Sequence, residues 1–393
     1  MTEPQKPQRN VLLLGIVSLL NDIGSEIIQP ILPLFIQSFG GGGMAVGLIG
    51  GISDGIPSLL KIFSGYWSDR IGRRKPLVFA GYFLSVVSKL LMALATAWQH
   101  VFILKSLERT GKGIRTAPRD AIIAASSDEK SRGRSFGIHR ALDTSGAVVG
   151  SALAFILWQR GMGFGSIIAV AGIISIVALA PLVLVKDVAK SKAPNQEISI
   201  SCLSPDLRKF VSIASIFALG NISYMFFLLK AGPLFSGNWA TGAPILLYLL
   251  FNIVYAVFSF PIGIWSDKVG KKTVLMLGYA LFAVVAFGFA YVSTVSILVL
   301  LFVLYGLVFA MVDGAERAYV SDLSKECVRG TVLGVYHGLV GMSALLSGVM
   351  AGVLWEEWSA RAAFLFASLL GLIATLLLFG MVRNDADYNK TFL

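Results

Sequence analysis

Apolar runs of membrane-spanning length recur along the whole chain and are separated by short polar breaks. About 20 consecutive apolar residues in an α-helix cross a hydrocarbon core about 30 Å thick. Runs of this length predict twelve spanning helices, at 10–38, 44–68, 76–97, 99–126, 132–158, 163–186, 208–236, 241–266, 273–293, 295–323, 329–355 and 361–382. The pattern therefore predicts an all-α polytopic membrane protein with twelve transmembrane helices.

An internal repeat relates the two halves of this pattern. The segment "GYWSDRIGRRKPL" at Gly65–Leu77 matches "GIWSDKVGKKTVL" at Gly263–Leu275, about 200 residues further along the chain. Asn21 of the first span corresponds to Asn221 of the seventh at almost the same spacing. Matched pairs at one spacing indicate two parallel halves of six spans each.

The long polar connection between the sixth and seventh predicted spans divides the two halves. It predicts an amino-terminal six-helix bundle over residues 1–187, a cytoplasmic linker over 188–207 and a carboxy-terminal six-helix bundle over 208–393. The repeat makes the two bundles pseudo-symmetric.

Charge decides the expected orientation. The 393 residues are 56% hydrophobic and only 14% charged, with a net charge of +11, whereas a soluble domain carries about 25% charged residues. Lys and Arg concentrate in the connections after spans 2, 4, 6, 8 and 10, while the opposite loops hold few of them. By the positive-inside rule, both termini are expected to be cytoplasmic. This asymmetry explains the net charge, so no nucleic-acid partner is expected.

The loop after spans 2 and 8 carries the pattern G-x-x-x-D-[RK]-x-G-[RK]-[RK] in both halves. With six-plus-six spans, this doubled motif resembles the major facilitator superfamily. "RTGKG" at Arg109–Gly113 is a looser match to that family's fourth-helix pattern, which has a Gln where this chain differs, and "ND-x-x-SE-x-x-x-P-x-x-P" in span 1 resembles a poorly characterised prokaryotic branch. The resemblance implies a multi-pass, monomeric secondary transporter of the cytoplasmic membrane. Alternating access would expose a site near the bilayer midplane between the halves.

In the family, the doubled motif closes the cytoplasmic side. The resemblance therefore implies a cytoplasmic gate formed by Gly65, Asp69, Arg70, Gly72 and Arg73 in one half and Gly263, Asp267, Lys268, Gly270 and Lys271 in the other. The residues themselves fit this role, because glycine permits a tight turn and an Asp at a helix end can meet neighbouring helix N-termini. An ordinary positive-inside loop would need the basic residues but not the repeated Asp and Gly.

Charged residues inside the spans point to function. A carboxylate at the bilayer centre costs about 2.5–3.5 kcal/mol on insertion scales, yet Asp22 and Glu26 stand four residues apart in "LLNDIGSEIIQPILPLF". The candidate substrate-binding or proton-coupling residues of the first half are Asp22, Glu26, Asp54, Glu108, Lys112, Arg115, Arg119 and Asp143. Four of them lie on one stripe of span 4 at spacings of four, three and four residues. In the resembled fold, helices 1 and 4 line the central cavity, so the acids of span 1 are expected to face these bases.

The second half offers a different surface. Ile222 and Phe226 replace the two acids of span 1, and the polar residues at mid-depth are mostly neutral. The candidate binding residues there are Asn221, Tyr224, Asn252 and Tyr255. Charge is thus concentrated in the first half, which is unexpected for a purely structural duplication.

Glycines at small-xxx-small spacing mark close helix contacts, since they let backbones approach. They are Gly47, Gly51 and Gly55 of span 2, Gly146 and Gly150 of span 5, and Gly348 and Gly352 of span 11. In the resembled fold, spans 2, 5, 8 and 11 form the seam between the halves, so these glycines are expected on that seam. Generic helix packing is the alternative for any single pair.

Two hypotheses for the charged network stay open. In the first, part of the network binds the substrate and protons. In the second, it is a structural salt-bridge network. Asp22 and Glu26 favour a cation, including a metal ion or its chelate, whereas Lys112, Arg115 and Arg119 favour an organic anion. A metal site would usually add His, Cys or Met, and none is near the two acids in sequence, so we expect no metal and no cofactor.

The expected partners are a small molecule or ion, protons and the lipid bilayer. A transporter-derived sensor is the alternative to transport, and no enzyme motif is present.

Overall fold

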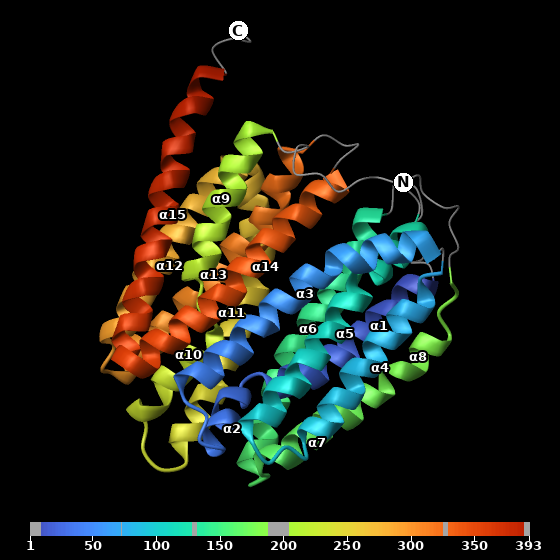
Figure 1. The fold of residues 1–393 in the computed structure, drawn as a ribbon, viewed down its shortest axis with the longest axis vertical. Helices are drawn as coiled ribbons and strands as arrows, with labels where there is room; N and C mark the ends of the chain where they lie inside the picture. Colours follow the sequence, from blue (N-terminus) through green and yellow to red (C-terminus); the bar gives the residue numbers. More distant parts are fainter. Residues whose placement is uncertain (1–8, 72, 128–131, 188–203, 325–328, 389–393) are drawn as a thin grey trace. The chain divides into compact units, whose positions relative to one another are not determined.

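The structure is a computed structural model that describes residues 9–71, 73–127, 132–187, 204–324 and 329–388. In these residues every regular element is a helix (Figure 1). Eleven helical segments are long and apolar enough to cross a membrane. The remaining predicted span, α5 (Trp98–Ala125), has the length but carries seven charged side chains between Lys105 and Asp120. Twelve predicted spans are thus matched by helices, and the all-helical fold is confirmed.

The chain divides into two compact units, and α3 contributes to both. Unit 1 contains residues 1–39 and 56–197, and unit 2 contains residues 40–55 and 198–393. The first part of α3 therefore groups with unit 2, although the sequence places it in the first bundle. Most of the predicted linker, 188–203, lies outside the described residues. The predicted boundaries at 187 and 208 stay a prediction.

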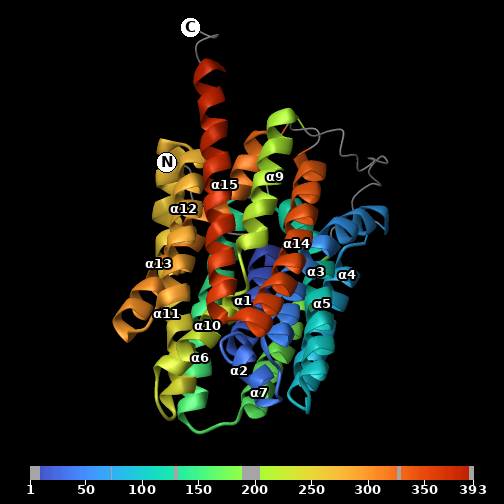
Figure 2. The same ribbon diagram turned by 60° about the vertical axis from the view of Figure 1, so that its left-hand side comes forward.

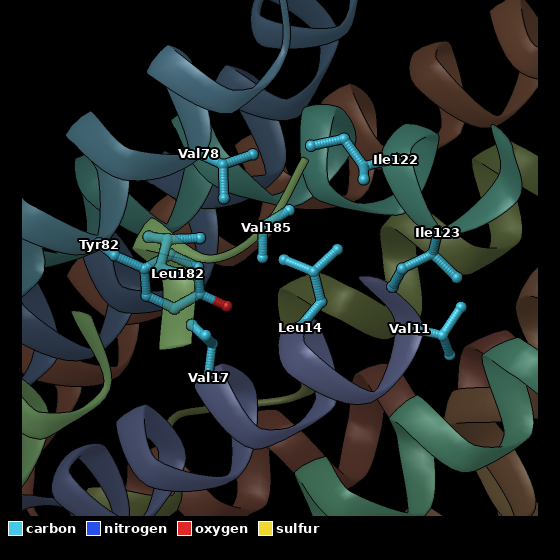
Figure 3. Close-up of a cluster of buried hydrophobic side chains, with 9 residues drawn as sticks. All are labelled: Val11, Leu14, Val17, Val78, Tyr82, Ile122, Ile123, Leu182 and Val185. Atoms are coloured by element: carbon cyan, nitrogen blue, oxygen red, sulfur yellow. The ribbon is translucent and has the colours of Figure 1, made fainter. Parts of the chain in front are cut away.

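The helices of unit 1 pair closely around a small apolar core. α1 packs on α6 and α7, and α4 packs on α5 and α7. Figure 3 shows the core where α1, α4, α5 and α8 meet, with Val11, Leu14, Val17, Val78, Tyr82, Ile122, Ile123, Leu182 and Val185 drawn. The helices that build this unit are α1 (Arg9–Ile28), α2 (Leu32–Ser38), the second part of α3 (Gly43–Ile71), α4 (Lys75–Met92), α5, α6 (Arg132–Gln159), α7 (Phe164–Val177) and α8 (Leu179–Val183).

Unit 2 repeats this neighbour pattern with an aromatic core. α12 packs on α13 and α15, and α9 packs on α14 and α15 (Figure 2). The ring of Phe227 stacks on Tyr305 at 4.3 Å and meets Phe289 edge-on at 4.8 Å. The elements are α9 (Pro205–Gly220), α10 (Tyr224–Ala231), η3 (Gly232–Leu234), α11 (Trp239–Val269), α12 (Lys271–Tyr291), α13 (Val295–Asp322), α14 (Arg329–Val353), η5 (Leu354–Trp358) and α15 (Ala360–Tyr388).

The first and seventh spans are each interrupted. α1 ends at Ile28 and α2 begins at Leu32, around Pro30, whose ring removes a backbone donor. The seventh span breaks between Gly220 and Tyr224, where the Ser223 side chain accepts a hydrogen bond from the backbone N–H of Met225 at 3.4 Å. Both predicted single spans therefore consist of two helices.

The glycines of spans 2 and 11 meet within unit 2. A Cβ added to Gly47 would lie 2.2 Å from the carbonyl oxygen of Gly348, and one added to Gly348 would lie 2.7 Å from the Cα of Gly51. Only residues without a Cβ allow this approach of α3 to α14. At the same end, Glu356 accepts a hydrogen bond from the backbone N–H of Met44 at 2.8 Å.

The other predicted seam glycines have a different place. A Cβ added to Gly146 would lie 2.9 Å from the carbonyl oxygen of Leu19, and one added to Gly150 would lie 2.6 Å from that of Ile23. These glycines bring α6 against α1 inside unit 1. The expectation that they mark the seam between the halves was wrong, because small-xxx-small spacing identifies a close contact but not the partner helix.

Candidate functional site

The charged stripe of α5 begins with a buried ion pair. Glu108 is 2.7 Å from the Nζ of Lys105 and 3.6 Å from the Nε of Arg109, and all three side chains are buried. Glu108 is one of the predicted site residues, and its carboxylate pairs with two cations of its own helix. Lys105 was missed, although a Lys in the apolar run "VFILK" was a visible signal.

Arg115 is held rigidly between α4 and α5. Its NH1 donates to the Ser85 hydroxyl at 2.6 Å, and its guanidinium lies 4.3 Å from the centre of the Tyr82 ring. The two helices approach closely here, since a Cβ on Gly81 would lie 2.5 Å from the carbonyl oxygen of Gly111. The side chain is only 3% exposed, and its Nε has no hydrogen-bond acceptor among the described residues.

Lys112 stands one turn before Arg115, at the middle of α5. Its side chain is half-buried, and in the described part of the chain no carboxylate lies within 4.0 Å of Lys112 or Arg115. The two cations still act electrostatically on Asp22 of α1. The interaction between Asp22 and these two cations is thus electrostatic, without an ion pair within 4.0 Å, and the facing of span 1 acids and span 4 bases stays a prediction.

The carboxyl of Asp22 meets a second acid. It interacts electrostatically with the carboxyl of Asp143 on α6, and it accepts a hydrogen bond from the Asn21 side chain at 3.3 Å. Gly146 permits this contact, because a Cβ there would lie 3.2 Å from the Cβ of Asp22. Asp143 also lies 3.5 Å from the guanidinium of Arg140.

Glu26 lies one turn further along α1 and is half-buried. It faces α6 at Gly150, where an added Cβ would lie 2.8 Å from the Cβ of Glu26. Its charge acts on Lys105. The two acids of span 1 therefore have different surroundings, which their shared helical face did not reveal.

Arg119 ends the stripe in a separate polar group. It pairs with Asp120 at 2.9 Å and donates to the Ser18 hydroxyl at 3.1 Å. Ser18 also contacts the Nε2 of His139 at 2.9 Å and the Tyr82 hydroxyl at 3.2 Å. This group ties α1, α4, α5 and α6 together, and it extends to the ring on which Arg115 lies.

Lys89 is a functional candidate that the sequence reading missed. It is fully buried on α4, and its Nζ donates to the backbone and side-chain oxygens of Asn21 at 3.1 and 3.2 Å and to the Ser175 hydroxyl at 3.0 Å. A Cβ on Gly24 would lie 2.2 Å from that hydroxyl. Lys89 thereby fixes the turn of α1 that carries Asp22.

The neutral candidates of unit 2 lie on three elements. Asn221 follows the last residue of α9, at the helix break. The ring of Tyr224 is 5.2 Å from that of Tyr248, Asn252 is buried on α11, and the Tyr255 hydroxyl donates to Asp313 at 2.8 Å. Asp54 also groups with unit 2, where its charge acts on Tyr305.

Unit 2 holds a buried acid that was not chosen as a candidate. Glu316 of α13 accepts hydrogen bonds from the hydroxyls of Tyr279 on α12, at 2.5 Å, and of Tyr336 on α14. All three side chains are buried. The partners come from helices that are far apart in sequence, so no local motif could reveal the cluster.

The predicted gate residues are described in part. Gly270 has a φ of +92°, which L side chains rarely adopt, so the expected tight turn is present. Lys271 pairs with Asp322 at 2.5 Å, whereas Asp267 and Lys268 are exposed. Gly65 and Gly263 lie in helices, and Arg70 and Arg73 are exposed. Gly72 and the side chain of Asp69 lie outside the described residues.

Comparison with known proteins identifies the family. The model of the Major Facilitator Superfamily matches residues 14–242 and 210–392. The chain belongs to the major facilitator superfamily. An uncharacterized MFS-type transporter of Methanocaldococcus jannaschii is 45% identical over 379 residues, which is 94% of each chain. This MFS protein is therefore a multi-pass membrane transporter with a small-molecule substrate, and not an enzyme.

More distant proteins share the architecture. The multidrug resistance protein MdtH of Photorhabdus laumondii is 23% identical over 93% of this chain and 92% of its own. The crystal structure of the nucleoside transporter NupG, a mutant, matches with a TM-score of 0.80 at 15% identity, covering 94% and 99% of the two chains. A mutant peptide transporter POT in complex with sulfate matches with a TM-score of 0.80 at 13% identity, covering 96% and 95%. These two structures support the twelve-helix MFS fold alone.

Proposed function

We propose that this MFS transporter couples the movement of a small solute to protons across the cytoplasmic membrane, with both termini in the cytoplasm. The observation that carries the proposal is the pairing of two acids, Asp22 and Asp143, which interact electrostatically where Gly146 brings α6 against α1. Such a pair binds one proton readily, because two like charges at close range disfavour full ionisation. Alternating access would then expose the pair to one side of the membrane and the other in turn.

The surroundings of the pair support a working site over a purely structural one. Asp22 is half-buried, and 23% of the Asp143 side chain is exposed, although both stand near the middle of their helices. Charges at this depth face a bundle interior or a water-filled space, since lipid contact is costly. We assign a structural role instead to Glu108, which is buried and forms ion pairs with Lys105 and Arg109 of its own helix.

Glu26 is the second proton-binding candidate of α1. It is half-buried, and its charge acts on Lys105, whereas Asp22 meets another carboxyl. The metal-cation alternative finds less support, because no group of three or more His, Cys, Asp or Glu comes together in the described part of the chain. We therefore assign the coupled proton to Asp22 and Asp143.

Proteoliposomes loaded with a pH-sensitive dye test the coupling. Inward gradients of an organic anion, a sugar, an amino acid and an organic cation are imposed in turn, and the change in internal pH is recorded. We expect one class to move protons in the wild type, and Asp22→Asn and Asp143→Asn to abolish this movement. Asp206→Asn, at an exposed carboxylate on α9, is the matched control. Proton movement at the wild-type rate in both variants, or none with any class, would refute the proposal.

A further inference from the structure

The charges of α5 do not balance. Between Lys105 and Asp120 the helix carries five basic and two acidic side chains. Glu108 lies between Lys105 and Arg109, and Asp120 pairs with Arg119. Lys112 and Arg115 remain, and no carboxylate lies within 4.0 Å of either in the described part of the chain. Uncompensated cations at the middle of a spanning helix are expensive, and they mark substrate or ion pathways.

Arg115 has the geometry of an anion receptor. The Ser85 hydroxyl and the Tyr82 ring fix the guanidinium, so little side-chain freedom is lost when it binds a ligand. Its Nε–H is buried and has no acceptor among the described residues, which leaves a donor unsatisfied. A planar guanidinium matches the two oxygens of a carboxylate or a phosphate. Lys112, three residues earlier, lies on the same helix face and adds a point charge.

The negative charge that acts on these cations belongs to the proposed proton site. Asp22 interacts electrostatically with both Lys112 and Arg115. When the Asp22 and Asp143 pair takes up a proton, this competing charge is reduced and an anion is held more tightly. By linkage, the bound anion favours proton uptake to the same extent. The other charged or titratable groups that face the pair are Lys89 of α4, Arg119 of α5, and His139 and Arg140 of α6.

We propose that the solute is a small organic anion, whose carboxylate or phosphate group binds Lys112 and Arg115 together with a proton at Asp22 and Asp143. This inference rests on the proposed proton coupling and adds the substrate class and the sign of the coupling. Anion and proton bind cooperatively and cross the membrane in the same direction.

Ligand-dependent thermal unfolding of the purified full-length protein tests the substrate class. Lactate, citrate and glucose 6-phosphate are the anionic probes, and glucose and choline are the neutral and cationic controls. We expect one anion to raise the unfolding temperature, and to do so more strongly at pH 6 than at pH 8. In Asp22→Asn the anion should still bind, and the difference between the two pH values should vanish.

Variants of the two cations locate the site. Lys112→Gln and Arg115→Gln should each weaken anion binding about 10- to 100-fold, the usual loss when a hydrogen bond to a charged group is removed. Arg160→Gln, an exposed arginine in a loop of the same unit, should leave the affinity unchanged. Arg115→Lys keeps the positive charge but not the planar guanidinium, so this variant should bind the anion with intermediate affinity. A lost contact predicts this intermediate affinity, whereas a fold defect does not.

Four results would overturn the inference. Stabilisation by glucose or choline alone would show another substrate class, and so would a wild type that none of the three anions stabilises. Unchanged anion affinity in both glutamine variants would place the anion elsewhere. Proton movement driven by the sugar or the organic cation would keep the proton coupling and remove only the anion, so the two proposals fail separately.

Discussion

α5 and α13 occupy equivalent places in the two halves of the repeat, yet they treat charge in opposite ways. α5 spreads seven charged side chains between Lys105 and Asp120, whereas the equivalent stretch of α13, residues 303–318, carries only Asp313, Glu316 and Arg317. The buried acid of α5 is Glu108, which is paired with cations, and that of α13 is Glu316, which is held by two phenols. Equivalent helices of the repeat thus differ in the number of charged side chains that they carry within the spans.

The difference shows how a transporter can localise its chemistry. A phenol satisfies a carboxylate by hydrogen bonding and leaves its charge in place, whereas a Lys neutralises it. In α5 the basic side chains outnumber the acidic ones, and among the described residues no carboxylate lies within 4.0 Å of Lys112 or Arg115. In unit 2 the aromatic rings around Phe227 and Tyr305 give a rigid, apolar frame.

The largest predicted effect concerns the ion pair of α5. Glu108→Gln leaves Lys105 buried without its counter-charge, and we expect a loss of about 3–5 kcal/mol in the free energy of unfolding. The double variant Lys105→Met with Glu108→Gln should recover most of this loss, because no lysine charge remains buried. Reversible unfolding in mixed detergent micelles measures both. A double variant as unstable as the single one would contradict the pairing.

The next effect concerns the helix contact of unit 2. Gly348→Ala places a Cβ 2.3 Å from the carbonyl oxygen of Gly47, so α14 and α3 must shift apart, at a cost of about 1–3 kcal/mol. Gly314→Ala on α13 is the matched control, because nothing lies within 4 Å of an added Cβ there. It should stabilise the helix by about 0.5–1 kcal/mol. Thermal unfolding that ranks the two variants equally would argue against the close backbone contact.

A smaller effect distinguishes the two buried acids. Glu316→Gln keeps a carbonyl acceptor for one phenol and leaves no cation unpaired, so we expect a loss of only about 1 kcal/mol. The comparison with Glu108→Gln in the same unfolding assay is the test. If Glu316→Gln proves as costly as Glu108→Gln, the two units do not differ in the way they hold a buried carboxylate.

The smallest effect on stability is expected at the predicted gate. Asp267 is exposed at the end of α11, so Asp267→Asn should change the free energy of unfolding by less than about 0.5 kcal/mol. If Asp267 belongs to a cytoplasmic latch, the variant should still increase labelling of a cysteine introduced by Trp67→Cys, with both native cysteines replaced by serine. Lys268→Gln is the control for a nonspecific charge effect. Unchanged labelling with normal transport would remove the latch.

Hydrophobic periodicity and the internal repeat were enough to predict the architecture. The helices begin and end within a few residues of the predicted spans, because each must cover the hydrocarbon core with satisfied backbone groups. The interruptions of spans 1 and 7 were not predicted, although Pro30 and the polar pair at Asn221 and Ser223 carried the signal. The doubled loop motif also pointed correctly to the superfamily.

The partners of the charged residues were decided by the tertiary structure. Helical spacing placed Glu108, Lys112, Arg115 and Arg119 on one stripe, but it did not show that Glu108 is already paired within α5. Asp22 and Asp143 meet because Gly146 lets α6 approach α1, and Lys89 reaches Asn21 and Ser175 across three helices. Contacts between residues over a hundred positions apart depend on which helices become neighbours. Hydrophobic patterning therefore defines the spans and places their charges along the chain, whereas helix packing defines which of these charges pair.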